Sequence, residues 1–150
     1  MYEGFKKYLN EISSPTYEDF IALCAMYHSG TLEKIPHYIA RKQGKEPIEY
    51  IHPVVEKYLK ETYGVLVYKE QIISLFQEIA NFTTKECDEL CAKMCRLMQS
   101  QLVLEYHKKF VNQGVLNGYD VQILEHIWYF IERNALYVGP KSETEANLLI

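Results

Sequence analysis

The chain has 150 residues, a length typical of one domain with a single sizeable core. Hydrophobic residues make up 48% of it and charged residues 24%, which argues against a disordered chain. The formal net charge of −4 counts against strong binding to duplex DNA by the chain alone, because neutralised phosphates supply most of that affinity. It leaves room for a local basic patch.

Cysteine spacing and hydropathy indicate the cellular compartment. Three of the four cysteines fall one helical turn apart, which is poor geometry for disulfides with one another and indicates reduced thiols. No apolar stretch approaches the roughly 20 residues that span a bilayer, and the N-terminal stretch MYEGFKKYLNEISS lacks the apolar segment of a secretory signal. We expect a cytoplasmic protein with no membrane partner.

Glycine and proline divide the first half of the chain into three predicted helices, over residues 16–30, 36–44 and 53–64. Thr16 caps the first of them, with Asp19 three residues on. Proline opens the other two and glycine ends all three, as these residues favour. The stretch VLVY, Val65–Tyr68, is too short for a helix and rich in β-branched residues, so it is predicted as an extended connector.

Four helices are predicted in the second half, over residues 72–80, 83–98, 102–112 and 120–135. Thr83 and Glu86 form a capping box at the start of the second of these. Gly114 and the pair Asn117-Gly118 are expected to interrupt the chain between the last two helices.

These elements predict an all-α fold, a compact multi-helix single domain with one short extended connector near 65–68. The sequence contains no internal repeat and no low-complexity linker. We assign residues 1–140 to the domain and residues 141–150 to a loosely ordered C-terminal tail.

Cys87, Cys91 and Cys95 raise the hypothesis of a metal site, since thiolates are good zinc ligands. Three ligands on one straight helix, with no partner pair elsewhere, rarely close a tetrahedron. The same helix face also carries apolar residues, namely Leu90, Met94, Met98 and Leu102. We therefore predict a buried stripe of small, soft side chains, with no metal and no cofactor.

Catalytic motifs are also missing from the sequence. Cys24 and His28 are four residues apart and could touch on one helix, but no third group completes a nucleophilic site. No P-loop, GxGxxG or GxSxG motif occurs. We predict no catalytic residue.

Arg41, Lys42 and Lys45 surround the helix end expected at Gly44. Cations at that end are favourable to the helix dipole, which explains them structurally. A patch that contacts phosphates is the functional alternative, and both interpretations stay open at this point.

Five blocks of sequence resemble one family in the same order, the bacterial DNA polymerase III α subunit. The blocks are YEDFIALCAMY, IPHYIARKQGKEPIEY, YLKETYGVLVYKEQI, IANFTTKECDELCAKM and FVNQGVLNGYDVQILEHIW, at 17–27, 35–50, 58–72, 79–94 and 110–128. They cover nearly the whole chain. In the family this run lies in the fingers region, just downstream of the catalytic palm, so the resemblance implies a fingers-like helical domain.

The resemblance also gives a meaning to the stretch TYGVLVYKEQ. In the family a Tyr-Gly pair, a hydrophobic run and Tyr-Gln-Glu-Gln join two fingers helices beside the nucleotide-binding cleft. The matching residues here are Tyr63, Gly64, Tyr68, Glu70 and Gln71, while Lys69 replaces the first glutamine.

Departures from the family pattern concern the chemical residues. The palm aspartates that hold two magnesium ions lie upstream in the family, so this chain alone is not expected to polymerise. The family's Arg-Pro-Gly-Pro is His28–Thr31 here and keeps only the glycine. Its Arg-Arg-Ala-Met-Gly-Lys-Lys, which resembles a triphosphate-gripping helix, is Cys91–Leu97 here and keeps Met94 and Arg96. Its Phe-Asn-Lys-Ser-His is Gly139–Glu143 and loses the histidine.

The resemblance implies a stand-alone, non-catalytic fingers-like module that takes part in DNA replication, through a replication protein or through weak binding to nucleic acid. A pure protein–protein interaction domain or a functionless remnant is the alternative, and an accessory piece of a split DNA polymerase is a further one. The candidate phosphate-binding residues are Arg41, Lys42, Lys45, Lys69, Lys93, Arg96 and Lys141.

Overall fold

The computed structural model describes residues 2–29, 31–96 and 100–148. In these residues the regular secondary structure is helical, and one isolated parallel bridge joins Tyr68 to Gly139. The helices are α1 (Tyr2–Asn10), α2 (Tyr17–His28), η1 (Leu32–Lys34), α3 (Ile35–Lys42), α4 (Pro53–Leu59), η2 (Lys60–Thr62), α5 (Lys69–Ala80), α6 (Thr84–Met94), α7 (Gln101–Leu116), α8 (Val121–Asn134) and α9 (Lys141–Leu148). The prediction of an all-α fold with an extended connector is confirmed.

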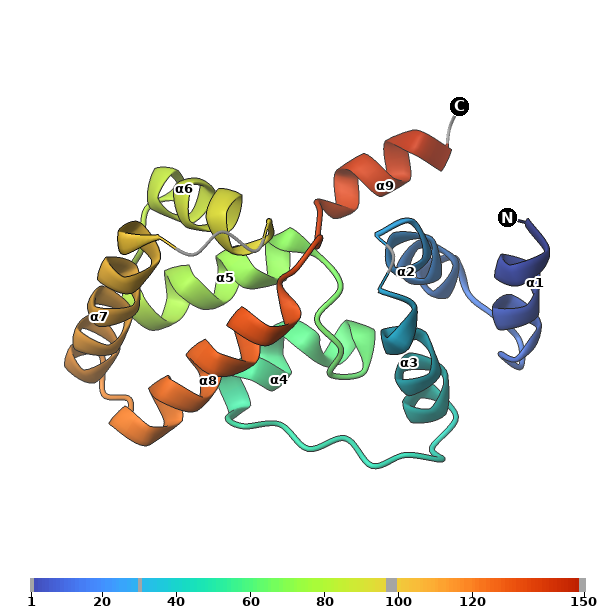
Figure 1. Ribbon diagram of the computed structural model, residues 1–150. Helices are drawn as coiled ribbons and strands as arrows, with labels where there is room; N and C mark the ends of the chain where they lie inside the picture. Colours follow the sequence, from blue (N-terminus) through green and yellow to red (C-terminus); the bar gives the residue numbers. More distant parts are fainter. Residues whose placement is uncertain (1, 30, 97–99, 149–150) are drawn as a thin grey trace.

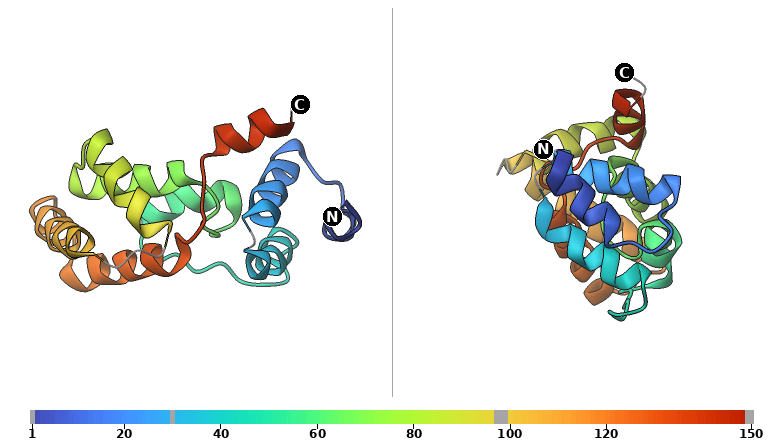
Figure 2. Two further views of the ribbon diagram at one scale, coloured as in Figure 1. Left: turned by 45° about the horizontal axis from the view of Figure 1, so that its top comes forward. Right: turned by 90° about the vertical axis from the view of Figure 1, so that its right-hand side faces the viewer.

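Two hydrophobic cores organise these helices. The larger core lies among α4 to α8 and contains Phe76, Phe110 and Trp128, whose rings are 5.5–5.8 Å apart between centroids. The smaller core lies among α1, α2 and α3, around Ile21 and Tyr38. Figure 1 shows the two groups at opposite ends of the molecule, joined by the extended segment between α3 and α4, and the left view of Figure 2 also keeps them apart.

Local hydrogen bonds fix the starts of the helices as the sequence predicts. The Thr16 hydroxyl accepts from Asp19 N at 3.1 Å, and the Asp19 carboxylate accepts from Thr16 N at 2.9 Å. Thr83 and Glu86 form the same reciprocal box at the start of α6, with distances of 3.0 and 3.1 Å. Both boxes satisfy backbone N–H groups that a helix start otherwise leaves without partners.

The interruption expected at Gly114 is wrong, because α7 runs through this residue and ends at Leu116. A Cβ atom at position 114 would lie 2.4 Å from Leu124 Cδ2, much closer than two carbon atoms can approach. The glycine therefore lets α8 pack closely on α7, and this tertiary contact outweighs its low helix propensity. The chain turns only afterwards, at Asn117 and at Gly118, whose φ is 94°.

Helices α1 and α9 were not predicted from the sequence. Helix α9 packs against α2, where Tyr17 OH donates to Glu145 Oε2 at 3.2 Å and Lys141 Nζ donates to Glu18 Oε2 at 2.9 Å. The division into a domain at 1–140 and a loosely ordered tail stays a prediction. The predictions made for Gly30, Leu97 and Met98 lie outside the described residues.

Most of the described part of the cysteine stripe is buried as predicted, while Leu102 is half-buried. Cys87, Leu90, Cys91 and Met94 belong to the larger core, and Cys95 is half-buried at the end of α6. None of the helices in the described part of the chain combines the length and the apolar composition needed to cross a membrane.

Candidate nucleic-acid interface

The connector, residues Val65–Tyr68, passes between the two cores. Its extended backbone points successive side chains in opposite directions, so Leu66 enters the larger core while Val65 and Val67 enter the smaller one. The β-branched run is thus explained by burial on both sides. After the connector, Lys69 N donates to Gly139 O at 2.9 Å, which fastens the start of α5 to the segment between α8 and α9.

Gln71 holds the connector in this extended form. Its side-chain Oε1 accepts from the backbone N–H groups of Val67 and Tyr68, both at 3.0 Å. Its Nε2 donates to Tyr58 O at 3.2 Å and to Thr62 Oγ1 at 2.9 Å. The side chain is buried, 3% exposed, and only an amide offers both an acceptor and donors at this position.

The pair Tyr63-Gly64 reverses the chain ahead of the connector. Both residues are left-handed, with φ of 54° and 80°. A Cβ atom on Gly64 would lie 2.9 Å from Ile48 Cγ2, so the position requires glycine both for conformation and for space. The Tyr63 carbonyl accepts from Arg41 Nη1 at 3.2 Å, which ties the turn to α3.

Glu70 and Lys141 connect the start of α5 to α9. The Glu70 carboxylate accepts from Lys141 N at 2.9 and 3.1 Å, so it acts at the start of α9. The Lys141 ammonium lies 5.5 Å from the centroid of the buried Tyr68 ring, and its hydrogen bond to Glu18 raises the pKa of Lys141. The family-matching residues at 63–71 thus use their polar groups mainly for hydrogen bonds within the domain.

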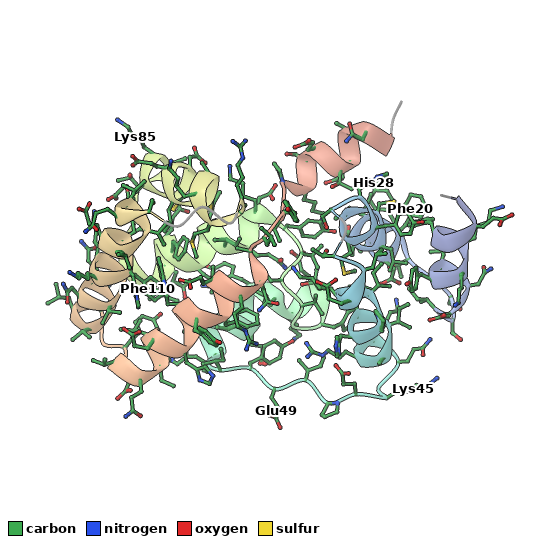
Figure 3. The ribbon with its side chains drawn as sticks, viewed as in Figure 1. Phe20, His28, Lys45, Glu49, Lys85 and Phe110 are labelled. Carbon is green, nitrogen blue, oxygen red and sulfur yellow. The ribbon has the colours of Figure 1, made fainter. Side chains whose placement is uncertain are left out.

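The candidate cations on α3 are largely engaged in holding that helix. Arg41 Nε donates to Glu46 Oε2 at 2.6 Å, and Lys42 Nζ bonds to Asp19 Oδ2. Asp19 is 1% exposed, and burial would raise its pKa, but hydrogen bonds from Lys42, the Thr16 backbone and side chain and Tyr38 outweigh burial and lower it. Lys45 is exposed and has no ion pair with any described residue, and Figure 3 shows it at the outer edge of the molecule.

The remaining candidates gather near the end of α6. Lys69 Nζ lies 3.4 Å from Asp88 Oδ1, and its charge acts on the Cys95 thiol together with that of Arg96. Arg96 is exposed and Lys93 half-buried, and neither pairs with a carboxylate in the described part of the chain. The structure therefore divides six of the candidates between the ends of α3 and α6, which Figure 1 shows well apart, while Lys141 lies at the start of α9.

The alternative metal and nucleophile hypotheses can be compared with the geometry. Within the described residues, no three His, Cys, Asp or Glu side chains come together in a way that could hold a metal ion. Cys24 is buried and His28 exposed, and burial raises the pKa of the Cys24 thiol to about 11. That thiol stays protonated at neutral pH and is a poor nucleophile.

Two features were missed by the sequence analysis. Lys34 is 9% exposed, and its ammonium donates to Leu66 O at 2.9 Å and to Asn134 O at 2.8 Å, which joins the connector to the end of α8. The second feature is a set of exposed apolar side chains on α7 and α8, namely Leu104, Leu116, Val121 and Tyr129, each at least 51% exposed. The number of apolar residues in these two helices was its only signal in the sequence.

The comparisons with known proteins agree with this fold. A family model described as the bacterial DNA polymerase III alpha subunit finger domain matches residues 2–118. The DNA polymerase III subunit alpha of Aquifex aeolicus (strain VF5) is 37% identical over 145 residues, which are 95% of this chain and 12% of that protein. That of Chlamydia trachomatis is 36% identical over 147 residues, 98% of this chain and 12% of that protein.

The same protein of Halalkalibacterium halodurans is 35% identical over 143 residues, 95% of this chain and 13% of the relative. The chain thus spans about an eighth of the length of the curated relatives that it matches. Both the family model and these relatives cover most of the chain. The chain therefore belongs to the finger domain family of the bacterial DNA polymerase III α subunit.

Proposed function

We propose that the chain is a finger domain used in DNA replication in the cytoplasm, that it binds primer–template DNA weakly, and that it does not transfer nucleotides by itself. The relatives are named DNA polymerase III subunit alpha, and the chain corresponds to about an eighth of them. Where the family grips a triphosphate, Cys91 is buried and packs in the core. A buried cysteine in place of a cation supports a role in contacting DNA rather than in nucleotide transfer.

We place the DNA contact at the end of α6 because the charged groups of Lys93 and Arg96 are available there to bind phosphates. Four of the seven candidate cations already pair with carboxylates, namely Arg41, Lys42, Lys69 and Lys141. Lys93 and Arg96 have no such partner among the described residues. Few available cations and a net charge of −4 together favour weak binding.

A fluorescence-anisotropy titration of a labelled primer–template, repeated across a salt series, tests the proposal. The double variant Lys93→Gln/Arg96→Gln should bind more weakly and lower the salt slope by about 1 to 2, since each phosphate contact contributes about 0.9. The matched control is Lys85→Gln, an exposed lysine at the other end of the same helix that Figure 3 shows far from Lys45. Variants of Arg41 and Lys42 are unsuitable, because they would break the ion pairs with Glu46 and Asp19 and so disturb the fold around α3.

Absence of binding at low salt, or equal loss in the control, would refute the DNA contact. A primer-extension assay with magnesium and all four nucleotides tests the second half of the proposal, and we expect no extension by the 150-residue chain. Extension that survives purification to homogeneity would refute it.

A protein–protein interaction domain is the second candidate, and the exposed apolar side chains on α7 and α8 favour it. Leu116 is 84% exposed and Tyr129 is 54% exposed. Exposed apolar side chains mark a contact site where they gather into one patch. A defined replication partner that copurifies with the chain, and is lost with Leu116→Ser but not with Lys85→Gln, would support this candidate over DNA binding.

A further inference from the structure

A cavity of about 290 Å³ lies where helices of the two cores meet, between η1 and α3 on one side and the end of α8 on the other. Figure 1 shows α8 running towards α3. The volume is several times the roughly 30 Å³ of one water molecule and near the lower limit, about 300 Å³, of pockets for drug-sized molecules. The cavity therefore suits a small ligand. Its polar walls are formed by Thr31, Glu33, Lys34, His37, Arg133 and Asn134.

Lys34 is a buried cation in the wall of this cavity. Its ammonium donates to Asn134 O, and since Asn134 also lines the cavity, the ammonium lies at the cavity wall. Two of its three N–H groups are used, by Leu66 O and Asn134 O, and the third has no acceptor among the described residues. No described carboxylate forms an ion pair with it either. A lysine buried to this degree usually has a charged partner, so a bound anion would supply what the protein leaves out.

Two further basic side chains line the same cavity. Arg133 is exposed, its guanidinium carbon lies 4.9 Å from the centroid of the Tyr129 ring, and it pairs with no described carboxylate. His37 Nδ1 donates to Glu46 Oε1 at 2.9 Å, so the His37 ring offers the cavity a second N–H only in its charged form. Lys34 and Arg133 are therefore the two cations that stay available to a ligand at neutral pH.

The balance of charge around the cavity favours an anion. Among the described lining residues Glu33 alone is acidic, and it is exposed, so the two available cations outnumber the carboxylates. Burial lowers the pKa of Lys34 to about 8, and the charges of Glu33 and Cys95 offset burial only in part. The nearby negative groups thus do not replace a counter-ion for Lys34.

We propose that this cavity binds a phosphate group, either inorganic phosphate or the phosphate of a small monoester. The guanidinium group of Arg133 can donate two N–H groups to phosphate oxygens, and the free N–H of Lys34 adds a third. A tetrahedral phosphate presents oxygens in several directions and can bond to η1 and α8 together, whereas a carboxylate presents both oxygens along one edge. Neither Arg133 nor Lys34 is among the candidate phosphate-binding residues that the family resemblance gives, so the site does not depend on the proposed DNA contact.

Titration of the ¹⁵N-labelled full chain with inorganic phosphate at constant ionic strength, followed by two-dimensional NMR, tests the proposal. Saturable shifts should appear in the backbone amides of residues 31–37 and 133–136. Arg133→Gln should weaken binding about tenfold or more, because hydrogen bonds to a charged group are lost. The matched control is Lys108→Gln, an exposed lysine of α7 outside this cavity, which should bind as wild type does. Glu33→Gln should tighten binding, by up to about fivefold, because it removes the opposing charge.

Two further ligands at the same ionic strength, glycerol 3-phosphate and acetate, identify the chemical class. Tighter binding of glycerol 3-phosphate than of inorganic phosphate would assign the cavity to phosphomonoesters, and the reverse order would assign it to the free ion. Acetate that binds as tightly as phosphate would overturn the proposal. So would the absence of saturable shifts at millimolar phosphate, an equal loss of binding in Lys108→Gln and Arg133→Gln, or weaker binding in Glu33→Gln.

Discussion

Replacing Gln71 with alanine should destabilise the domain more than any surface change on the same helix. The glutamine bonds to both ends of the chain reversal, accepting from Val67 N and Tyr68 N and donating to Tyr58 O and Thr62 Oγ1. Alanine would leave two backbone N–H groups of the buried connector without acceptors. Thr62 would keep its bond to Val65 O at 2.7 Å.

The size of the effect follows from the two orphaned donors. A buried donor left without a partner costs about 1–3 kcal/mol, so two of them cost about 2–6 kcal/mol, less whatever a water molecule recovers. That is a large part of the 5–15 kcal/mol by which domains are usually stable. Urea unfolding followed by circular dichroism measures it, with Gln77→Ala as the control because Gln77 is exposed on the same helix.

Gln71→Glu adds a test of the geometry. The carboxylate can accept from the two N–H groups but cannot donate to Tyr58 O, and its burial disfavours the charged form. Its folded pKa should therefore be raised, so the stability of this variant should fall as pH rises from about 4. A Gln71→Ala loss within about 0.5 kcal/mol of wild type, the range of ordinary surface changes, would refute the role given to this residue.

Three further changes test other parts of the fold. Asp19→Ala should cost about 3–5 kcal/mol in urea unfolding, because the half-buried Lys42 and the buried Tyr38 hydroxyl both lose the buried carboxylate that they bond to. Wild-type stability should also fall as pH drops through the lowered pKa of Asp19. Gly114→Ala should cost about 1–3 kcal/mol through overlap with Leu124, while Gly139→Ala, with open space around it, should be neutral in the same thermal melts. Lys34→Met should cost about 1–3 kcal/mol by leaving two carbonyls without donors. Because burial lowers the pKa of Lys34 to about 8, wild-type stability should also rise with pH from about 8 to about 10, a rise that Lys34→Met should lack.

Local chemistry made much of the fold predictable from the sequence. Thr16 and Thr83 with their acidic partners mark helix starts through bonds made within four residues of chain. Proline marks helix starts and glycine marks helix ends for the same reason, because both act on the local backbone. The stripe that contains Cys87 and Cys91 was predictable because its spacing alone places it on one face.

The rest depended on contacts distant in sequence. Gly114 stays helical because Leu124 packs against it from the next helix, which no local propensity reveals. Lys34 is buried by partners 32 and 100 residues away, at Leu66 and Asn134. The candidate cations were predicted by type, and only the tertiary fold shows that four of the seven pair with carboxylates.

We propose above that this finger domain contacts DNA at the end of α6. Titration of the ¹⁵N-labelled chain with primer–template, followed by two-dimensional NMR, tests it most directly because every region of the surface reports separately. We expect shifts to concentrate at Lys93–Arg96, Lys69 and residues 137–141. Shifts confined to the end of α3 near Lys45 or to the exposed apolar side chains around Leu116, or no shifts at low salt, would contradict it.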